Sequence, residues 1–494
     1  MDPHASGQSI TSMVARPVLD SLVHLDDQGG IKPWLAASWD VSADQKTYTF
    51  KLRDGVTFSD GAVLDAAAVK ANIEHVVDPK TKSLGAAGYL APYLKGVSAV
   101  DARTVRIELT KPYASLLTVL STTGYGIESP RTLAGNPAEL CQKIVGTGPF
   151  VLDGPWRRGQ GATYHRNPAY AWAPEGAAHQ GPALLDGLAI KLITQDSVRV
   201  GALSSGQADF ITSVPAIRVA SLRDTGRQVR TIDSPGENYS YYPNTTRAPF
   251  SDVRIRKAFR AAVDWKTLVD KLYFGVYRQA EGPLSPATRF VAPPAETSAP
   301  YDPAAAGRLL DEAGYTGRDS AGYRVKGGTR LTVVWKMAKT AESQENQTLG
   351  EQVQAELKKS GIELRIEDLP LSQVIPNAQN GTYDLLATTF TGLDADVLRK
   401  LFHSDSIARP GTMGSNIPKY DNAEVDQALL DAQATADEST RAGLYTRIQR
   451  RLVEDAVVFP VYVSAATFAA DQKVRGVTYT AEGYPDFTGA WRSR

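Results

Sequence analysis

The residues best suited to catalysis or metal binding are widely spaced in this chain. The six histidines among the 494 residues are His4, His24, His75, His165, His179 and His403. No two of them lie four residues apart around a glutamate, the spacing that places two imidazoles on one face of a zinc-binding helix. Lone histidines are more often surface or structural residues than ligands, although distant residues can converge in a fold. We therefore expect no metal site and no cofactor.

The candidate nucleophiles are equally isolated. Cys141 is the single cysteine, so no intramolecular disulfide is possible, and a lone cysteine is more often a small buried residue than a reactive thiol. Residues 146–150 are glycine-rich but lack the lysine of a phosphate-binding loop, and Pro149 stands where such a loop needs an N–H donor. Residues 411–415 do not have the Gly-x-Ser-x-Gly spacing of a nucleophile elbow. The sequence predicts that the protein is not an enzyme.

The overall composition points to a soluble protein with more than one packed unit. Lysines and arginines number 54, and so do aspartates and glutamates, which gives a formal net charge of zero. This balance argues against a nucleic-acid-binding protein and against a polybasic membrane-binding surface. A chain of 494 residues is too long for one ordinary core, so we expect two or three packed units.

Neither a transmembrane span nor a signal peptide is visible. The most apolar stretch, residues 456–470, is shorter than the ~18 to 20 residues that a span needs, and it contains Pro460. Residues 457–463 are better interpreted as a buried strand. The chain opens on a polar segment at Met1 and Asp2, so the numbering describes either a trimmed mature form or a truncated start.

The elements that must position any site alternate between strand and helix. Strand periodicity occurs in residues 47–52, 104–109, 187–193, 331–335 and 362–366. The turn at residues 101–103 predicts a hairpin between residues 97–100 and 104–109. Asp65 can cap a helix that carries Val69 and Ile73 on one side. This mixture predicts α/β layers.

Other helices are marked by their starts and ends. Asp302 and Pro303 begin a helix that spans residues 301–314, and another helix is expected over residues 342–360. A longer helix is predicted to begin near Asp252 and to continue through Leu272. The proline-rich residues 284–300 are predicted to be a connector without an element.

Short segments in order along nearly the whole chain resemble one family of transport proteins. They are residues 2–4 (Asp-Pro-His), 32–39 (Lys-Pro-Trp-Leu-Ala-Ala-Ser-Trp), 48–61 with its Phe-Ser-Asp-Gly turn, 146–150 (Gly-Thr-Gly-Pro-Phe), 166–170 (Arg-Asn-Pro-Ala-Tyr), 244–258, 301–314 and 381–384 (Gly-Thr-Tyr-Asp). Together they resemble extracellular solute-binding protein family 5, the dipeptide-, oligopeptide- and nickel-binding proteins of ABC importers. Among the motif residues, Trp39, Asn244 and Arg256 are interpreted as structural.

The resemblance implies a two-lobed periplasmic-binding-protein-like α/β fold of type II, cluster C, with an extra domain on the first lobe. Lobe I is expected to comprise residues 1–25, 145–240 and 455–494, the extra domain residues 26–144, and lobe II residues 241–454. The lobes are expected to close about a hinge over a small solute, most simply a peptide or peptide-like compound.

For a peptide ligand, the resemblance implies a carboxylate that binds the ligand's ammonium group shortly after Asp384. Asp394 is the first candidate and Asp396 the register-shifted alternative. The competing interpretation is that both aspartates cap the helix that begins near Val397. The sequence leaves these alternatives open.

The resemblance also suggests which residues form the walls of the cleft. Phe390 occupies a position that is often tryptophan in relatives, and Leu371 replaces another aromatic residue. Tyr89 or Tyr93 is expected to close the cleft from the extra domain, and backbone groups from Gly7 to Ser9 are expected to line it.

The expected partners are the solute, an ABC permease and its ATPase, with no nucleic acid. We expect a monomer outside the cytoplasm, in the periplasm or at the cell surface, held to the membrane only by a lipid anchor that is not seen in this chain. Two alternatives remain open at this point: a binding protein of the same fold that serves signalling or biosynthesis, and a protein that binds an organic metal chelate or a sugar.

Overall fold

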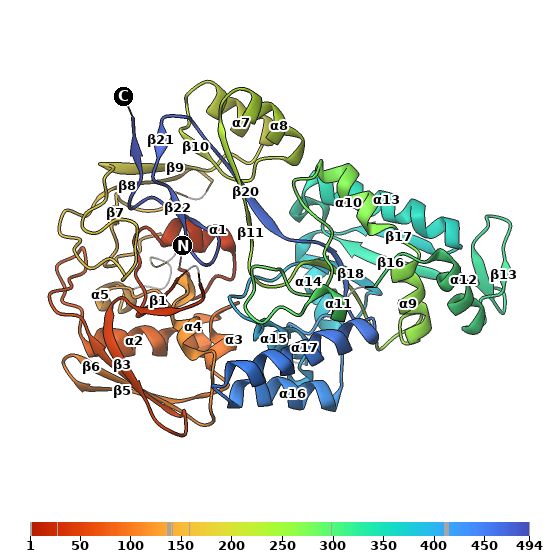
Figure 1. The fold of residues 1–494 in the computed structure, drawn as a ribbon, viewed down its shortest axis with the longest axis horizontal. Coiled ribbons are helices and arrows are strands. Elements are labelled where there is room, and N and C mark those ends of the chain that lie inside the picture. Colours follow the sequence, from red (N-terminus) through yellow and green to blue (C-terminus); the bar gives the residue numbers. More distant parts are fainter. Residues whose placement is uncertain are drawn as a thin grey trace.

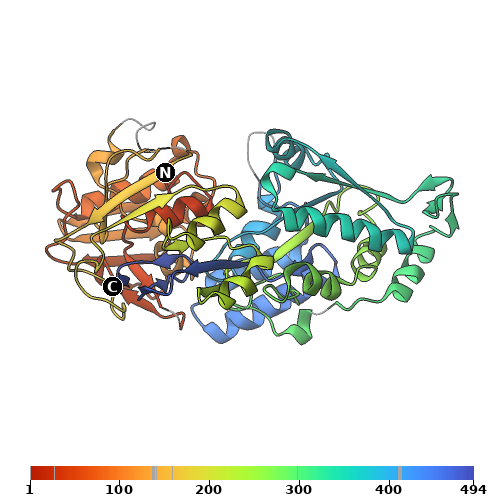
Figure 2. The ribbon, with the colours of Figure 1, turned by 90° about the horizontal axis from the view of Figure 1, so that it is seen from above.

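The computed structural model describes residues 2–26, 28–135, 140, 142–157, 159–297, 299–409 and 414–493. These residues form two bodies that lie side by side along the longest axis of the molecule (Figures 1 and 2). We call the body with the five-stranded sheet lobe II and the other body lobe I. Lobe I also carries a four-stranded sheet, which we call the extra domain. Both termini lie in lobe I (Figure 1).

The extra domain is an antiparallel sheet with one long helix beside it. The strands are, in sheet order, β3 (Ala36–Val41), β4 (Thr47–Leu52), β6 (Thr104–Leu109) and β5 (Leu94–Asp101). The predicted hairpin is confirmed, because Val97 of β5 pairs with Ile107 of β6. Helix α2 (Ala66–Val77) begins where the Asp65 carboxylate accepts a hydrogen bond from the Ala68 N–H at 2.8 Å, as the sequence predicts. The short helices α3 (Ala87–Leu90) and α4 (Leu116–Leu120) follow.

Lobe I adds two three-stranded antiparallel sheets and several helices. The first sheet has the order β7 (Phe150–Leu152), β8 (Gly161–Arg166), β9 (Gly187–Lys191), and the second has the order β10 (Phe210–Ile211), β20 (Ala465–Ala470), β11 (Gln228–Asp233). The helices are α1 (Ser9–Ala15), α7 (Asp196–Ser204) and α8 (Ala216–Asp224). Two short pairs close the chain: β21 (Val474–Arg475) with β24 (Trp491–Arg492), and β22 (Thr478–Tyr479) with β23 (Pro485–Asp486). Lobe I is therefore assembled from segments that are far apart in the sequence.

Lobe II is built around a mixed five-stranded sheet. Its strands are, in sheet order, β17 (Glu363–Asp368), β16 (Thr332–Met337), β18 (Leu385–Thr388), β12 (Tyr239–Pro243) and β19 (Phe459–Tyr462). Strand β16 is parallel to β17 and β18, whereas β12 is antiparallel to β18 and β19. The helices are α9 (Val253–Ala261), α10 (Trp265–Tyr273), α12 (Pro303–Glu312), α13 (Gln344–Ser360), α14 (Leu371–Asn380), α15 (Val397–Phe402), α16 (Ala423–Ala434) and α17 (Glu438–Glu454). Leu349, Val353 and Leu357 of α13 are fully buried, and each such side chain contributes roughly 1.5–3 kcal/mol to stability.

Two predictions of individual elements were wrong. The long helix expected from Asp252 is two helices, α9 and α10, because the Asp264 carboxylate accepts from the Thr267 N–H and starts a new helix. The expected connector contains a short helix, α11 (Pro294–Thr297). The predicted buried strand at residues 457–463 is confirmed as β19, and the rest of the apolar stretch forms a second strand, β20, in lobe I. Cys141, expected to be a small buried residue, lies outside the described residues.

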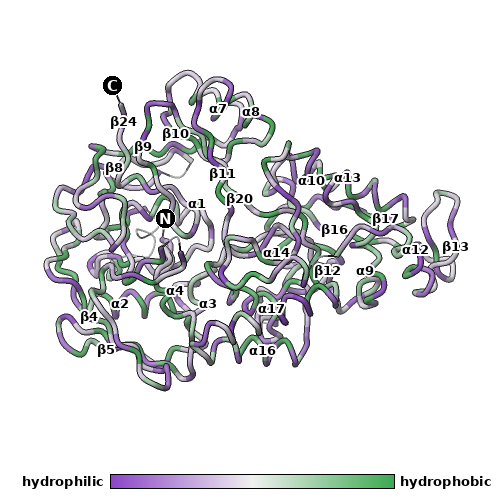
Figure 3. Tube along the Cα trace, viewed as in Figure 1, coloured by the Kyte–Doolittle hydropathy of each residue, from purple (hydrophilic) through white to green (hydrophobic). Residues whose placement is uncertain are grey.

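Hydrophobic residues are interspersed with polar ones along the whole trace (Figure 3). Within the described ranges, no helix combines the length and the apolar character that crossing a membrane requires.

Candidate functional site

The chain crosses between the lobes at two adjacent connections. Residues 234–238 join β11 to β12, and residues 463–464 join β19 to β20. The Ser234 N–H donates to the Ser464 carbonyl oxygen at 2.8 Å, so the two connections lie side by side. Strands β11 and β20 run together toward lobe II in Figure 1. Two short paired connections are the geometry of a hinge.

A loop of lobe II covers this hinge. The Glu237 N–H donates to the Phe390 carbonyl oxygen at 2.7 Å, and the Gly392 N–H donates to the Pro235 carbonyl oxygen at 3.2 Å. Between them Gly236 has φ of +115°, and a Cβ atom there would lie 2.2 Å from the Phe390 carbonyl oxygen. Glycine is therefore required at this position both for its conformation and for the close approach of the loop.

A cavity of about 190 Å³ lies in lobe I beside the end of this loop. Its wall includes Leu393 from lobe II, so the cavity lies on the boundary between the lobes. The polar and aromatic side chains of lobe I that line it include Arg16, Asp20, His24, Trp34, Tyr170, His179, Glu482 and Asp486. A larger cavity of about 580 Å³ is lined by lobe I alone, around β9, β10 and β24, and lobe closure would not enclose it. We therefore take the first cavity as the candidate site.

Arg16 is the fixed cation of this cavity. Its Nη2 lies 3.3 Å from Glu482 Oε2, and the two side chains are only 10% and 11% exposed. The guanidinium also donates to the Ser121 carbonyl oxygen at 3.0 Å and to the Ser21 hydroxyl at 2.9 Å, and it lies 5.3 Å from the centre of the Trp34 ring. Arg16 Nε is buried and has no hydrogen-bond partner among the described residues. A guanidinium held in this way in the wall of a cavity suits an anionic group such as a carboxylate.

Asp20 is a fully buried acid in the same wall. Its Oδ2 accepts hydrogen bonds from Thr147 Oγ1 at 2.8 Å and from Trp172 Nε1 at 3.0 Å. Burial raises the pKa of Asp20 to about 7, although the hydrogen bond from Thr147 and the charge of Arg16 oppose the rise. Near neutral pH the cavity therefore contains a carboxyl group that readily takes up or releases a proton.

Asp394, the first candidate for binding an ammonium group, lies where lobe II meets the extra domain. It is 4% exposed, and its Oδ2 accepts hydrogen bonds from Ser115 Oγ at 2.7 Å and from Arg441 Nη2 at 3.4 Å. Burial and the nearby charge of Asp396 raise the pKa of Asp394, while Arg441 and Ser115 oppose the rise. The carboxylate thus already has a cationic partner and a cross-domain hydrogen bond.

Asp396 makes a parallel set of contacts. It is 1% exposed, accepts from the Tyr113 hydroxyl at 2.8 Å and pairs with Arg399, whose Nε lies 2.8 Å from Oδ1. The residue is the N-cap of α15, but its side chain makes no capping bond, whereas Asp394 Oδ1 accepts the Asp396 N–H at 2.9 Å. Asp396 therefore stands at the N-cap position, as the capping interpretation predicts, but its carboxylate does not cap the helix.

The two tyrosines proposed to close the cleft lie in different environments. Tyr93 is 1% exposed and stacks on Tyr113 with ring centres 4.3 Å apart. Tyr89 is partly exposed; its hydroxyl donates to the Thr391 carbonyl oxygen at 3.5 Å, and the Lys400 ammonium lies 5.0 Å from its ring centre. Tyr89 thus reaches from the extra domain to the loop that covers the hinge.

The remaining predicted wall residues are accessible to different degrees. Leu371 begins α14 and is 48% exposed, and Phe390 is partly buried against the core of lobe II. Gly7 is exposed, and Ser9 is the exposed first residue of α1. The ligand-binding roles of these residues, of both tyrosines and of both aspartates stay predictions.

The cavity residues were missed by sequence reasoning. Arg16 and Glu482 are 466 positions apart, and neither belongs to one of the recognised segments. Their pairing depends on the C-terminal segment returning to lobe I, and a charge pair at that separation leaves no pattern in a single sequence. Trp34 was noted only as part of a family motif.

Comparison with known proteins identifies the family. The family model described as Bacterial extracellular solute-binding proteins, family 5 Middle, matches residues 30–406. The glutathione-binding protein GsiB of Escherichia coli (strain K12) is 27% identical over 494 residues, which cover 96% of this chain and 89% of that protein.

Solved structures share the fold. NikA from Brucella suis, in complex with Fe(III)-EDTA, superposes with a TM-score of 0.84 at 28% identity, covering 99% of this chain and 97% of that one. The oligopeptide-binding protein AppA from Bacillus subtilis, in complex with a nonapeptide, gives a TM-score of 0.82 at 21% identity over 100% of this chain and 96% of that one. The predicted two-lobed fold is confirmed. The chain belongs to family 5 of the bacterial extracellular solute-binding proteins, the binding components of ABC importers.

Proposed function

We propose that the chain captures a small peptide or peptide-like solute at the lobe boundary and delivers it, chemically unchanged, to an ABC permease and its ATPase. The observation that carries the ligand class is the pair Arg16 and Glu482 in a cavity that Leu393 of lobe II also lines. Peptides carry both a carboxylate and an ammonium group, and a wall with opposite fixed charges complements both. The similarity to GsiB supports this class, because glutathione is a tripeptide.

Closure is the proposed mechanism of capture. A solute that contacts both lobes binds the closed state better than the open one and shifts the equilibrium toward closure. Closure about residues 234–238 and 463–464 also excludes water and strengthens polar contacts in the site. We propose that lobe I comprises residues 1–25, 145–233 and 465–494, the extra domain residues 26–144, and lobe II residues 239–462. The expected boundaries at residues 240 and 455 move because β12 and β19 belong to the sheet of lobe II.

The proposed walls divide into two groups. Tyr89, Phe390, Leu371, Gly7 and Ser9 have some exposed surface, so a solute can contact them without rearrangement. Asp394, Asp396 and Tyr93 are buried, and they would contact a solute only if the extra domain moved away from lobe II.

We further propose that the protein acts without catalysis, as a monomer in the periplasm or at the cell surface, held there by a lipid anchor.

An organic metal chelate is the second candidate solute. The similarity to NikA in complex with Fe(III)-EDTA favours it, because such a chelate presents several carboxylates. The Arg16 guanidinium in the cavity wall would bind one of them.

The test combines native mass spectrometry of the purified chain with a thermal-shift screen. The screen includes glutathione, other short peptides, single amino acids and metal chelates. A ligand at ~100 times its dissociation constant should stabilise the protein by about 2.7 kcal/mol. Finding no stabilising peptide, peptide-like compound or chelate would refute the proposed ligand classes.

Arg16→Lys tests the site, because lysine keeps the charge and loses the forked donors. We expect affinity for the identified solute to fall by about tenfold or more, the equivalent of about 1.4 kcal/mol. Arg227→Lys is the matched control: Arg227 forms a similar ion pair with Asp471 in lobe I, where the two side chains are 18% and 17% exposed, and it does not line the cavity. Equal affinities in the two variants would remove Arg16 from the site.

A further inference from the structure

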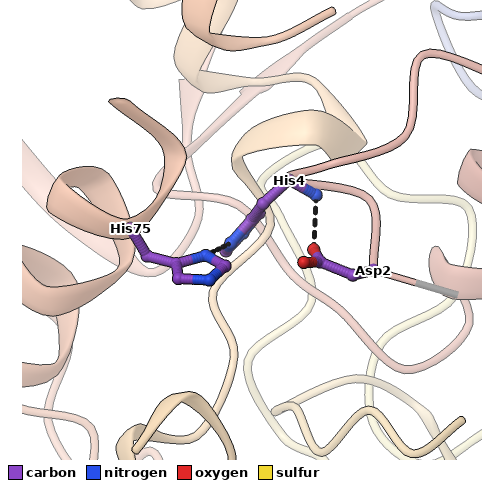
Figure 4. Close-up of side chains that lie close together, drawn as sticks. All are labelled: Asp2, His4 and His75. Atoms are coloured by element: carbon purple, nitrogen blue, oxygen red, sulfur yellow. Dashed lines mark hydrogen bonds between the residues drawn. The ribbon is translucent and has the colours of Figure 1, made fainter. Parts of the chain in front are cut away.

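Asp2, His4 and His75 meet where the N-terminal segment packs beside α2 (Figure 4). One potential ligand atom from each residue lies within 4.8 Å of the others. His4 Nδ1 is 3.0 Å from His75 Nδ1; Asp2 and His4 are buried, and His75 is partly exposed. The two histidines are 71 positions apart, so their sequence spacing predicted no such cluster.

His4 is held in the tautomer that suits a metal ligand. Its Nε2 lies 2.8 Å from the Gly126 carbonyl oxygen, which can only accept, so Nε2 carries the proton. The lone pair is then on Nδ1 and faces His75. Metal-binding histidines commonly donate their other ring N–H to a carbonyl or carboxylate oxygen, which fixes the ring.

Glu128 is a buried carboxyl group whose backbone is bound to the same helix as His75. It is fully buried, and neither carboxyl oxygen has a hydrogen-bond partner among the described residues. Its backbone is tied to α2, because the Glu128 N–H donates to Asn72 Oδ1 at 2.8 Å, one helical turn before His75. In the described part of the chain, neither Glu128 nor Asp2 forms a side-chain ion pair.

We propose that Asp2, His4 and His75 bind one divalent transition-metal ion of the Zn²⁺, Ni²⁺ and Co²⁺ class. Two nitrogens bound at ~2.0–2.1 Å to one tetrahedral ion lie roughly 3.3 Å apart, so the 3.0 Å pair needs to open only slightly. The ion replaces the proton between the rings, and that proton moves to Nε2 of His75. Two imidazoles with one carboxylate favour these metals over Mg²⁺ and Ca²⁺, which prefer oxygen ligands.

The site is separate from the solute cavity, because none of its residues lines that cavity. Its effect would be structural. The ion would join the N-terminal segment that leads into α1 to the helix α2 of the extra domain.

The test is a titration of the untagged, EDTA-treated chain with CoCl₂, followed by its visible absorption, and with ZnCl₂, followed by calorimetry. We expect one equivalent to bind and the unfolding temperature to rise, with no rise in MgCl₂. His75→Gln and Asp2→Asn should each bind Co²⁺ and Zn²⁺ at least about tenfold more weakly. His165→Gln is the matched control, because His165 is exposed and also lies beside a carboxylate, that of Asp153. The metal affinity of this variant should be unchanged.

Two results would overturn the proposal: no saturable binding of one equivalent, or unchanged affinity in both variants of the cluster. His75 is at the partly exposed end of α2, so His75→Gln should fold, and circular dichroism of the metal-free variants checks this. Solute binding by the same variants is measured in parallel and should be retained in metal-free protein.

Discussion

Asp20, Glu128 and Glu237 are carboxyl groups that the fold has removed from water. Burial raises the pKa of Asp20 to about 7 and that of Glu237 to about 8, and it raises the pKa of Glu128 as well. Each therefore binds a proton more tightly in the native protein than in the unfolded chain. The stability of the protein should consequently depend on pH in a range where ordinary carboxylates no longer titrate.

Asp20→Asn isolates one of these contributions. The native protein retains the Asp20 proton while the unfolded chain loses it above its ordinary pKa of 3.8, so stability should fall as the pH rises from about 4 to about 7. The slope approaches about 1.4 kcal/mol per pH unit for one group. Asparagine removes the titration and keeps an acceptor for Thr147 and Trp172.

The measurement is denaturant unfolding of both proteins at several values between pH 4 and pH 8. The variant should lose less stability than the native sequence over this range. Parallel curves would show that the Asp20 proton does not contribute, since Glu128 and Glu237 titrate equally in both proteins.

At the scale of single residues, sequence reasoning located segments better than it located contacts. The resemblance pointed to the loop around Asp394, and the structure places that loop over the hinge. It could not show that Ser115 and Arg441 would donate hydrogen bonds to the Asp394 carboxylate, because both residues come from distant parts of the chain. Arg256 is different: its structural role was predicted, and its guanidinium donates to the backbone carbonyls of Phe250 and Asp455.

At the scale of elements, the extra domain is fastened to lobe II by a buried polar network. Tyr113 and Ser115, just before α4, bond to Asp396 and Asp394, just before α15. Arg399 of α15 and Arg441 of α17 supply two positive charges that match the two carboxylates. Hydrogen bonds to charged groups in such a setting contribute more than neutral ones.

Tyr113→Phe tests this network by removing one hydroxyl. The loss leaves Asp396 with one buried hydrogen bond fewer and should cost about 1.5–3 kcal/mol of unfolding free energy. Tyr93→Phe is the matched control, because the Tyr93 ring stacks on Tyr113 and its hydroxyl has no partner among the described residues. It should change stability by less than about 0.5 kcal/mol. Similar costs for the two variants, measured by urea unfolding, would contradict the assignment.

Gly236→Ala tests the contact between the hinge and its covering loop. The added methyl group would meet the Phe390 carbonyl oxygen at 2.2 Å, and the strain should cost about 1–3 kcal/mol beyond the penalty for positive φ. Gly206→Ala measures that penalty alone, because Gly206 has φ of +75° and no atom within 4 Å of the added Cβ. Thermal unfolding compares the stabilities of the two variants. If Gly236→Ala is as stable as Gly206→Ala, the loop around Phe390 moves away from the added methyl group without a measurable cost.

Elements with a local signal were predicted, and elements defined by their neighbours were not. Asp65 and Asp302 predicted the starts of their helices because each carboxylate accepts a hydrogen bond from an N–H only three residues further along. The break between α9 and α10 also has such a signal in Asp264, but the continuing apolar residues concealed it. The division of residues 456–470 between two sheets in different lobes has no local signal, because strand partners decide it.

At the scale of the whole molecule, the recognised segments predicted the family and the two-lobed fold because they span most of the chain. They did not predict the cavity, which depends on C-terminal residues returning to lobe I beside Arg16. They also did not predict the Asp2, His4 and His75 cluster, which depends on how the N-terminal segment packs on the extra domain. Long-range packing of this kind is set by the assembled core and leaves no spacing rule in a single sequence.

The position of β20 has a consequence for how the protein is made. This strand is the middle member of the β10-β20-β11 sheet, yet it follows all of lobe II in the sequence. A ribosome therefore releases both outer strands long before the strand that joins them, while lobe II is synthesised as one continuous stretch. Lobe II can fold first during synthesis, and lobe I must wait for nearly the last residues to emerge. The β10-β20-β11 sheet can therefore be completed only near the end of synthesis, whereas the sheet of lobe II needs no residue after Tyr462.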